Sequence, residues 1–273
     1  MTQRIKDKLA ERNPEPEKKL VEIDKLGLLS GHPLLVKELN LIIHQPLLRD
    51  VSTFGENEFF RIYSTLVLTR SKIDTEESGI TEEKLALTTD MQWVMTSCMS
   101  SDSREHYTKL FLGMILPDYD IELSKENMNM SFTHKNFPVK EKAPRIVIDS
   151  DNLQIFQTVL KILFSRGSSS VESEYNVQSA IAKRIAAKLK ESKERIQLQK
   201  PAGKKIESVL ASTISSLAVA LQLPVRTIFE KYTIPQLYDQ VERFEKRDKY
   251  LRDIQSIFAG AEDVEIESWY EEQ

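Results

Sequence analysis

Apolar residues recur at intervals of three and four along most of the chain, the spacing that places them on one face of an α-helix. This pattern predicts helices over 55–73, 103–116, 151–164 and 234–259. In the last segment the apolar stripe consists of Leu237, Val241, Phe244, Leu251, Ile254 and Phe258. In 55–73 the stripe consists of Phe59, Ile62, Tyr63 and Leu66, and in 103–116 it consists of Tyr107, Leu110, Phe111 and Met114. In 151–164 it consists of Leu153, Phe156, Val159, Leu160 and Leu163.

Residues 31–45 show a shorter version of the same pattern. The apolar residues at helical spacing are Leu35, Leu39, Ile42 and Ile43. Pro33 is tolerated in a first helical turn, so we predict a helix here that ends at Pro46. Short helices are also expected to begin at Thr81 and Asp90, because polar residues of this kind cap helix starts.

The pattern changes from helical to strand-like after residue 127. The segments 128–134 (MNMSFTH) and 144–149 (PRIVID) alternate or run apolar over strand length. They predict one small β-hairpin near 130–148. Because an isolated hairpin is marginally stable, we expect it to pack on the helix 151–164. The predicted fold is therefore mainly α, a multi-helix protein with one small β-hairpin.

Charge and composition divide the chain into five parts. Net charge is −4, but the region 175–205 carries nine Lys or Arg against two acids, and 261–273 carries six acids and no base. The Ser-rich segment 166–176 (RGSSSVESEYN) reads as a flexible connector. The predicted parts are a charged amino-terminal arm (1–26), a helical region with the hairpin (27–165), the connector (166–176), a carboxyl-terminal helical region (177–260) and an acidic tail (261–273).

The sequence predicts an intracellular protein. No run reaches the roughly 18 apolar residues that a membrane span requires, and the charged amino terminus lacks the apolar centre of a signal peptide. Cys98 is the only cysteine, which excludes an intrachain disulfide and a thiolate-rich zinc site. Its apolar surroundings (MQWVMTSCM) indicate a buried, unreactive thiol. We expect a cytoplasmic protein without contact to a membrane.

No catalytic or cofactor motif stands out. The four histidines, His32, His44, His106 and His134, lack metal-ligand spacing, and there is neither a glycine-rich phosphate loop nor a nucleophile elbow. We therefore predict no catalytic residue, no metal ligand and no cofactor. An enzyme whose site is assembled from residues distant in sequence is the alternative.

Residues 215–233 (SSLAVALQLPVRTIFEKYT) read as helix, break and helix. A helix-turn-helix places core residues where this segment has Leu217, Ala218, Leu221, Leu223 and Ile228. Gln222 stands at the position of the expected turn glycine. The DNA-binding candidates would be Arg226, Thr227 and Lys231, with phosphate contacts from the basic helix predicted over 177–200. An ordinary helical corner is the competing interpretation.

The acidic tail offers a second binding hypothesis. It intersperses acids with Val264, Ile266, Trp269 and Tyr270. Aromatic anchors flanked by acids are typical of a peptide that docks on a basic surface. In this chain the basic candidates are Lys183, Arg184 and Lys188, on the same or another molecule. A solvated tail without a partner is the competing interpretation.

The succession of segments from 206 to 260, followed by an acidic segment that closes on Trp269, resembles phage tail-assembly and virion proteins. The resembling stretch includes the start of the long charged helix at Tyr232–Leu237 (YTIPQL). The resemblance implies a non-enzymatic role as a tail or baseplate component, or as a tail-assembly chaperone. It implies other phage structural or assembly proteins, or a second copy, as partners. The location implied is the host cytoplasm or the virion.

Overall fold

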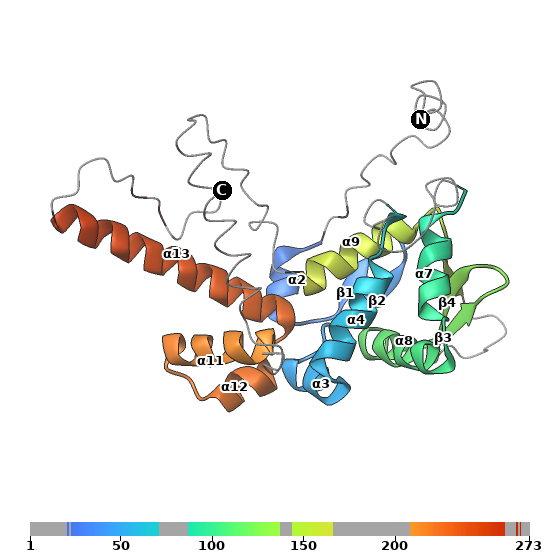
Figure 1. Cartoon of the computed structure of the whole chain (residues 1–273), viewed down its shortest axis with the longest axis horizontal. Helices are drawn as coiled ribbons and strands as arrows, with labels where there is room; N and C mark the ends of the chain where they lie inside the picture. Colours follow the sequence, from blue (N-terminus) through green and yellow to red (C-terminus); the bar gives the residue numbers. More distant parts are fainter. Residues whose placement is uncertain are drawn as a thin grey trace, which may run out of the picture. The chain divides into compact units, whose positions relative to one another are not determined.

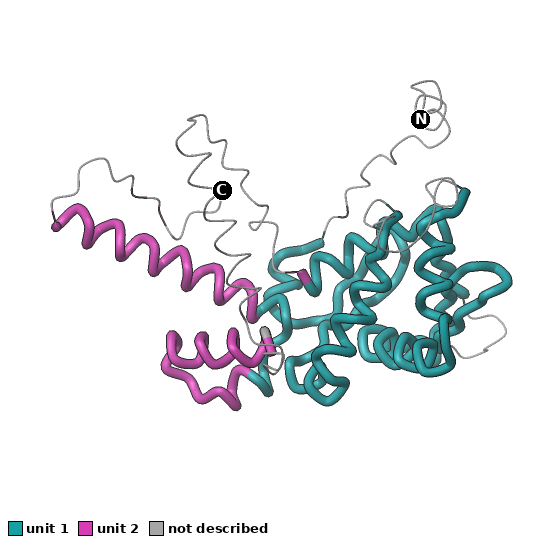
Figure 2. Tube along the Cα trace, in the orientation of Figure 1, with its two compact units in different colours: residues 1–164, 229–236 teal, residues 165–228, 237–273 magenta. Residues whose placement is uncertain are grey.

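The structure is a computed structural model that describes residues 21, 23–70, 87–136, 144–165, 208–259, 266 and 268. The helix start predicted at Thr81, the connector 166–176 and the helix predicted over 177–200 lie outside these residues. Most of the arm 1–26 and of the tail 261–273 also lie outside them. The chain divides into two compact units (Figure 2). Unit 1 is Met1–Phe164 with Phe229–Gln236, and unit 2 is Ser165–Ile228 with Leu237–Gln273.

The described residues are mainly helical, with short antiparallel strands in unit 1 (Figure 1). The helices are α2 (Lys25–Ser30), α3 (Leu48–Phe54), α4 (Glu56–Leu66), α7 (Asp90–Cys98), α8 (Asp102–Ile115), α9 (Leu153–Phe164), α11 (Val209–Leu221), α12 (Val225–Lys231) and α13 (Ile234–Phe258). The strands are β1 (Leu34–Val36), β2 (Leu41–Ile43), β3 (Tyr119–Ser124), β4 (Asn129–His134) and β5 (Arg145–Ile148). The predicted fold class, mainly α with a little β, is confirmed.

The predicted hairpin is present as β4 and β5, which pair antiparallel with Phe132 opposite Ile146. Strand β3, which the sequence did not predict, pairs with β4 and makes the sheet three-stranded in the order β3-β4-β5. The turn between β3 and β4 contains Met128 at φ 45°. The Phe132 ring lies 6.1 Å from that of Phe156 on α9, so the sheet packs on this helix as predicted.

The prediction of a helix over 31–45 is wrong. This segment forms a second hairpin, in which Leu34–Val36 pairs antiparallel with Leu41–Ile43 through a turn that holds Asn40 at φ 49°. Its side chains alternate between buried and exposed, so that Leu35 is 56% and Ile42 36% exposed. The dense apolar run fits a period of two as well as a helical period. The turn at Asn40 and the pairing across it favour the period of two.

The core of unit 1 lies where α4 packs against α8 and α9. The Phe59 ring lies 4.9 Å from that of Phe111 and 5.2 Å from that of Phe164, and all three rings are buried. The stripe predicted for α9 is buried throughout. In α8 the buried face is instead Thr108, Phe111, Leu112 and Ile115. The prediction of Leu110 as a core residue is wrong, because it is 47% exposed.

A buried amide explains why α4 ends at Leu66 although its helical pattern continues to residue 73. Gln157 on α9 is 3% exposed. Its Nε2 donates hydrogen bonds of 3.0 Å to the carbonyl oxygens of both Leu66 and Leu68. Carbonyls at the end of a helix have no partner within the helix, and burying them unpaired is costly. Gln157 supplies the missing donor.

We predict that Gln157→Leu lowers the free energy of unfolding by roughly 1–3 kcal/mol, because the carbonyls of buried Leu66 and half-buried Leu68 lose their donor. The measurement is urea denaturation followed by circular dichroism. Gln154→Leu, on a half-buried position of the same helix, is the control and should shift the free energy by less than about 0.5 kcal/mol. Equal effects of the two substitutions would contradict this role of Gln157.

Candidate functional site

The segment between α12 and α13 belongs to unit 1 and is held there by backbone pairing. The backbone N–H of Leu48 donates to the Tyr232 carbonyl at 2.9 Å, and Leu47 and Thr233 form an antiparallel bridge. Thr233 and Ile234 are fully buried. Residues 232–236 of the YTIPQL segment, which lies in the stretch that resembles phage proteins, therefore belong to unit 1.

Thr233 and Gln236 cap the start of α13 reciprocally. The Thr233 N–H donates to Gln236 Oε1 at 2.9 Å, and the Gln236 N–H donates to Thr233 Oγ1 at 3.5 Å. The amide of Gln236 also donates from Nε2 to the Leu29 carbonyl at 2.7 Å. This is a capping box, and it confirms the predicted helix start after Thr233 with Pro235 in the first turn.

Beyond this anchor, the apolar stripe of α13 becomes exposed at Phe244, Leu251 and Phe258, while Val241 and Ile254 are half-buried. None of residues 244–259 is buried. Phe244 is 38%, Leu251 44% and Phe258 87% exposed. The predicted stripe is therefore present on the helix, but its carboxyl-terminal half does not contribute to a core. Exposed apolar rows of this kind mark interaction surfaces.

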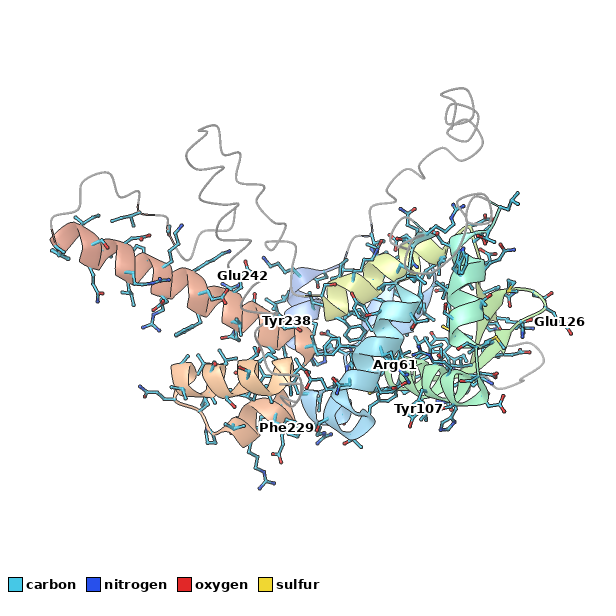
Figure 3. All side chains as sticks on the ribbon, viewed as in Figure 1. Arg61, Tyr107, Glu126, Phe229, Tyr238 and Glu242 are labelled. Atoms are coloured by element: carbon cyan, nitrogen blue, oxygen red, sulfur yellow. The ribbon has the colours of Figure 1, made fainter. Side chains whose placement is uncertain are left out.

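Ion pairs four residues apart run along the charged sides of α13. Asp239 pairs with Arg243 at 2.9 Å, Glu242 with Lys246 at 2.9 Å and Asp248 with Arg252 at 3.1 Å. Figure 3 labels Tyr238 and Glu242 on successive turns of this helix. Each exposed pair stabilises a helix by only about 0.3–0.5 kcal/mol. Together they favour a helix that persists in water without tertiary cover over its last turns.

Helices α11 and α12 meet at an angle of 118°, joined by Gln222, Leu223 and Pro224. Gln222 adopts the left-handed conformation at φ 54°. The Leu223 N–H donates to the Ala218 carbonyl and the Gln222 N–H to that of Val219, which is a Schellman end. The angle and the short turn match a helix-turn-helix corner.

The residues predicted for this corner are only partly placed as expected. Leu217, Ala218 and Ile228 are buried, but the prediction of Leu223 as a core residue is wrong because it is 37% exposed, and Leu221 is half-buried. The side chain of Leu223 follows the left-handed turn and so leaves the helical face that Leu217 and Ala218 share.

The proposed DNA contacts lie on a short helix. Arg226 and Lys231 are exposed and Thr227 is half-buried, on a helix of seven residues. Glu230 lies one turn after Arg226, and an acid at that spacing offsets the charge of the arginine. The electrostatic attraction of this surface for phosphates is therefore weak.

The predicted docking pair of acidic tail and basic helix lies largely outside the described residues. Ile266 is described and is 47% exposed. Val264, Trp269 and Tyr270 lie outside, as do Lys183, Arg184 and Lys188. The hypothesis that these two groups dock together stays a prediction.

Two features of unit 1 that resemble reactive chemistry have structural explanations. Cys98 is fully buried, and burial raises the pKa of its thiol to about 11, so the thiol stays protonated at neutral pH. The His44 side-chain Nε2 lies 2.9 Å from Asp118 Oδ2. The backbone N–H of His44 donates to the Ile115 carbonyl, and these contacts join the end of β2 to the end of α8. Sequence reasoning missed this pair, since its members are 74 residues apart.

The described part of the chain contains no group of three or more His, Cys, Asp or Glu that could hold a metal ion. No single helix in it has the length and apolar composition to cross a membrane, although the bent pair α11 and α12 meets these criteria jointly.

The carboxyl-terminal part of the chain is similar to a known protein family. Residues 202–272 match the family described as YomV second domain, a phage-associated family. The match spans α11, α12 and α13 and most of the acidic segment, nearly the stretch 206–269 on which the likeness to phage proteins was noted. It supports a phage protein. Neither a curated protein nor a solved structure matches the chain.

We predict that Gln236→Ala lowers the free energy of unfolding by about 1–2 kcal/mol, because the bond from the Thr233 N–H to Gln236 Oε1 and the bond to the Leu29 carbonyl are both lost. Gln240→Ala on the same helix is the control and should have little effect. Gly31 supports the same contact: it has φ +74°, and an added Cβ would lie 3.1 Å from Gln236 Nε2. Gly31→Ala should destabilise comparably.

The two substitutions should also be coupled. In a Gln236→Ala background the crowding at residue 31 disappears, so the double variant should lose less than the sum of the single losses, by roughly 0.5–1 kcal/mol. Strict additivity would show that Gly31 and Gln236 act independently. The measurement is the same urea denaturation, performed on all four proteins.

Proposed function

We propose that the protein is a non-enzymatic interaction protein in the assembly or structure of a bacteriophage tail or baseplate. The observation that carries the proposal is a coincidence of two features in one segment. The stretch similar to a phage-associated family also carries the solvent-facing stripe of Phe244, Leu251 and Phe258. Apolar rows of this kind expose surface that a partner can bury.

The partner in this proposal is another phage structural or assembly protein. The charge distribution supports a protein partner, because acids in 261–273 and bases in 175–205 can select and orient complementary surfaces. Apolar contacts along α13 would supply the affinity, and the charged ends the specificity. The protein acts in the host cytoplasm, and retention in the virion would make it a structural component.

A DNA-binding regulator is the second candidate function. It is favoured by the 118° corner between α11 and α12, which has the geometry of a helix-turn-helix. Its contacts would be Arg226, Thr227 and Lys231. The acid one turn from Arg226 and the seven-residue length of α12 weigh against it.

Affinity capture tests the proposal. The tagged full-length protein is used as bait in a lysate of the native host producing the phage, followed by mass spectrometry and light scattering on the same sample. We expect tail or baseplate proteins to be enriched over a lysate from cells without the phage. A variant that lacks 261–273 should retain fewer of them, since the acidic segment is the proposed source of specificity.

Two outcomes would contradict the assembly role. Recovery of duplex DNA that is released by moderate salt, and lost in the double variant Arg226→Ala with Lys231→Ala, would favour the regulator. Recovery of a lone monomer that turns over a common metabolite or nucleotide would favour an enzyme.

A further inference from the structure

The apolar positions of α13 follow the spacing of a coiled coil. Positions 237, 241, 244, 248, 251, 255 and 258 are separated alternately by four and three residues, which is a heptad repeat with two core positions in each seven. Five of the seven are apolar, and the exceptions are Asp248 and Gln255. A straight helix that keeps this repeat presents a narrow seam suited to one other helix.

The seam is uncovered over its second half. Exposure rises along it, from fully buried Leu237 to 44% at Leu251 and 87% at Phe258. Phe244, Leu251 and Phe258 therefore present apolar surface that the described residues leave exposed. The charged residues beside the seam indicate which partner could bury these positions.

We propose that α13 pairs with α13 of a second copy in antiparallel orientation. In this register Val241 lies against Phe258 of the second copy, and Asp248 against its Leu251. The residues beside the seam then meet as Glu245 with Arg252 of the second copy, and the twofold axis repeats this pair. Opposite charges in these flanking positions set the partner and the orientation.

The parallel arrangement is disfavoured by the same residues. It would place Asp248 directly opposite Asp248 of the second copy in the seam. It would also place Arg247 beside Arg252 of the second copy. In the antiparallel pair Asp248 meets an apolar residue instead and keeps its ion pair to Arg252 of its own helix, 3.1 Å away. The antiparallel orientation therefore keeps these like charges apart, whereas the parallel orientation brings them together.

This self-association goes beyond the assembly role and does not depend on it. A seam of about three heptads is small for a stable interface, so we expect the purified protein to dimerise with a Kd in the range of roughly 1–100 μM. A phage protein present in many copies would reach such concentrations locally, where it is assembled.

Sedimentation of the purified full-length protein over about 1–300 μM tests the dimer. We expect the mass to rise toward that of a dimer, and Leu251→Ser to weaken dimerisation at least roughly tenfold by removing a core position. Asp253→Ser, at a half-buried position on the side of the same helix opposite the seam, is the control and should dimerise like the wild type. Circular dichroism at low concentration shows whether each variant keeps its helices.

Charge reversals test the orientation. In the antiparallel pair, Glu245→Arg alone and Arg252→Glu alone each create like-charge contacts and should each weaken dimerisation. An equal mixture of the two variants restores both ion pairs and should dimerise as heterodimers. In a parallel pair, Arg252→Glu would instead strengthen dimerisation, because it would face Arg247 of the second copy.

Three results would overturn the proposal. The first is a wild-type protein that stays monomeric over the whole concentration range. The second is a dimer that Leu251→Ser leaves unchanged. The third is a mixture of the two charge variants that associates no better than either variant alone. A failed capture experiment would leave this proposal standing, so the two are separable.

Discussion

The capping pair Thr233 and Gln236 is the contact on which the carboxyl-terminal part of the chain depends. It satisfies the first N–H groups of α13, and through Gln236 Nε2 it reaches the Leu29 carbonyl, 207 residues away in sequence. The bond from Leu48 to Tyr232 adds backbone pairing beside it. Contacts between segments so distant in sequence form only when the loop between them closes, and that closure costs entropy. The start of α13 is therefore fixed by unit 1, whereas its exposed turns continue past this anchor.

The helices that could be predicted are those with a strong and isolated period. In α4 and α9 the apolar residues recur at helical spacing, and the structure buries the predicted stripes except for Tyr63, which is half-buried. The segment 31–45 failed because its apolar residues are so dense that two periods fit. Pairing of the two strands across the turn at Asn40 favours the strand period over the helical one. The end of α4 likewise depends on a long-range partner, Gln157, that no local pattern reveals. Strand β3 pairs with the neighbouring β4 across a short turn that holds Met128 at φ 45°.

For the candidate surface, the sequence predicted the stripe but could not predict its exposure. Periodicity reports which residues share a face of α13, and it is the same for a face that packs in a core and for one that faces water. The corner at Gln222 was visible as a break, but its angle and the exposure of Leu223 come from the left-handed turn. Gln236 belongs to the predicted helix start at 232–237, but its bond to Leu29 and its contact with Gly31 carried no sequence signal, since they join distant segments.

These features describe a helix that is capped at one end by the protein's own fold and left available at the other. The assembly role and the antiparallel pairing both use the exposed end, and both are consistent with the similarity of this segment to a phage-associated family. If the second copy and the phage partner bind the same face of α13, they compete for it. The α13 pair would then cover the apolar seam before assembly, and the phage partner would replace the second copy during assembly.

Hydrogen–deuterium exchange of the full-length protein, with and without purified tails or tail-assembly intermediates of its phage, tests the interaction role of α13 most directly. At a concentration of about 0.5 μM, below the Kd range expected for self-association, the amides of residues 244–258 should exchange rapidly in the free protein. We predict that they become protected when the phage fraction is added, while Gln157 and the rest of α9 do not change. Unchanged exchange over 244–258, with protection elsewhere or nowhere, would contradict the assignment of α13 as the interaction surface.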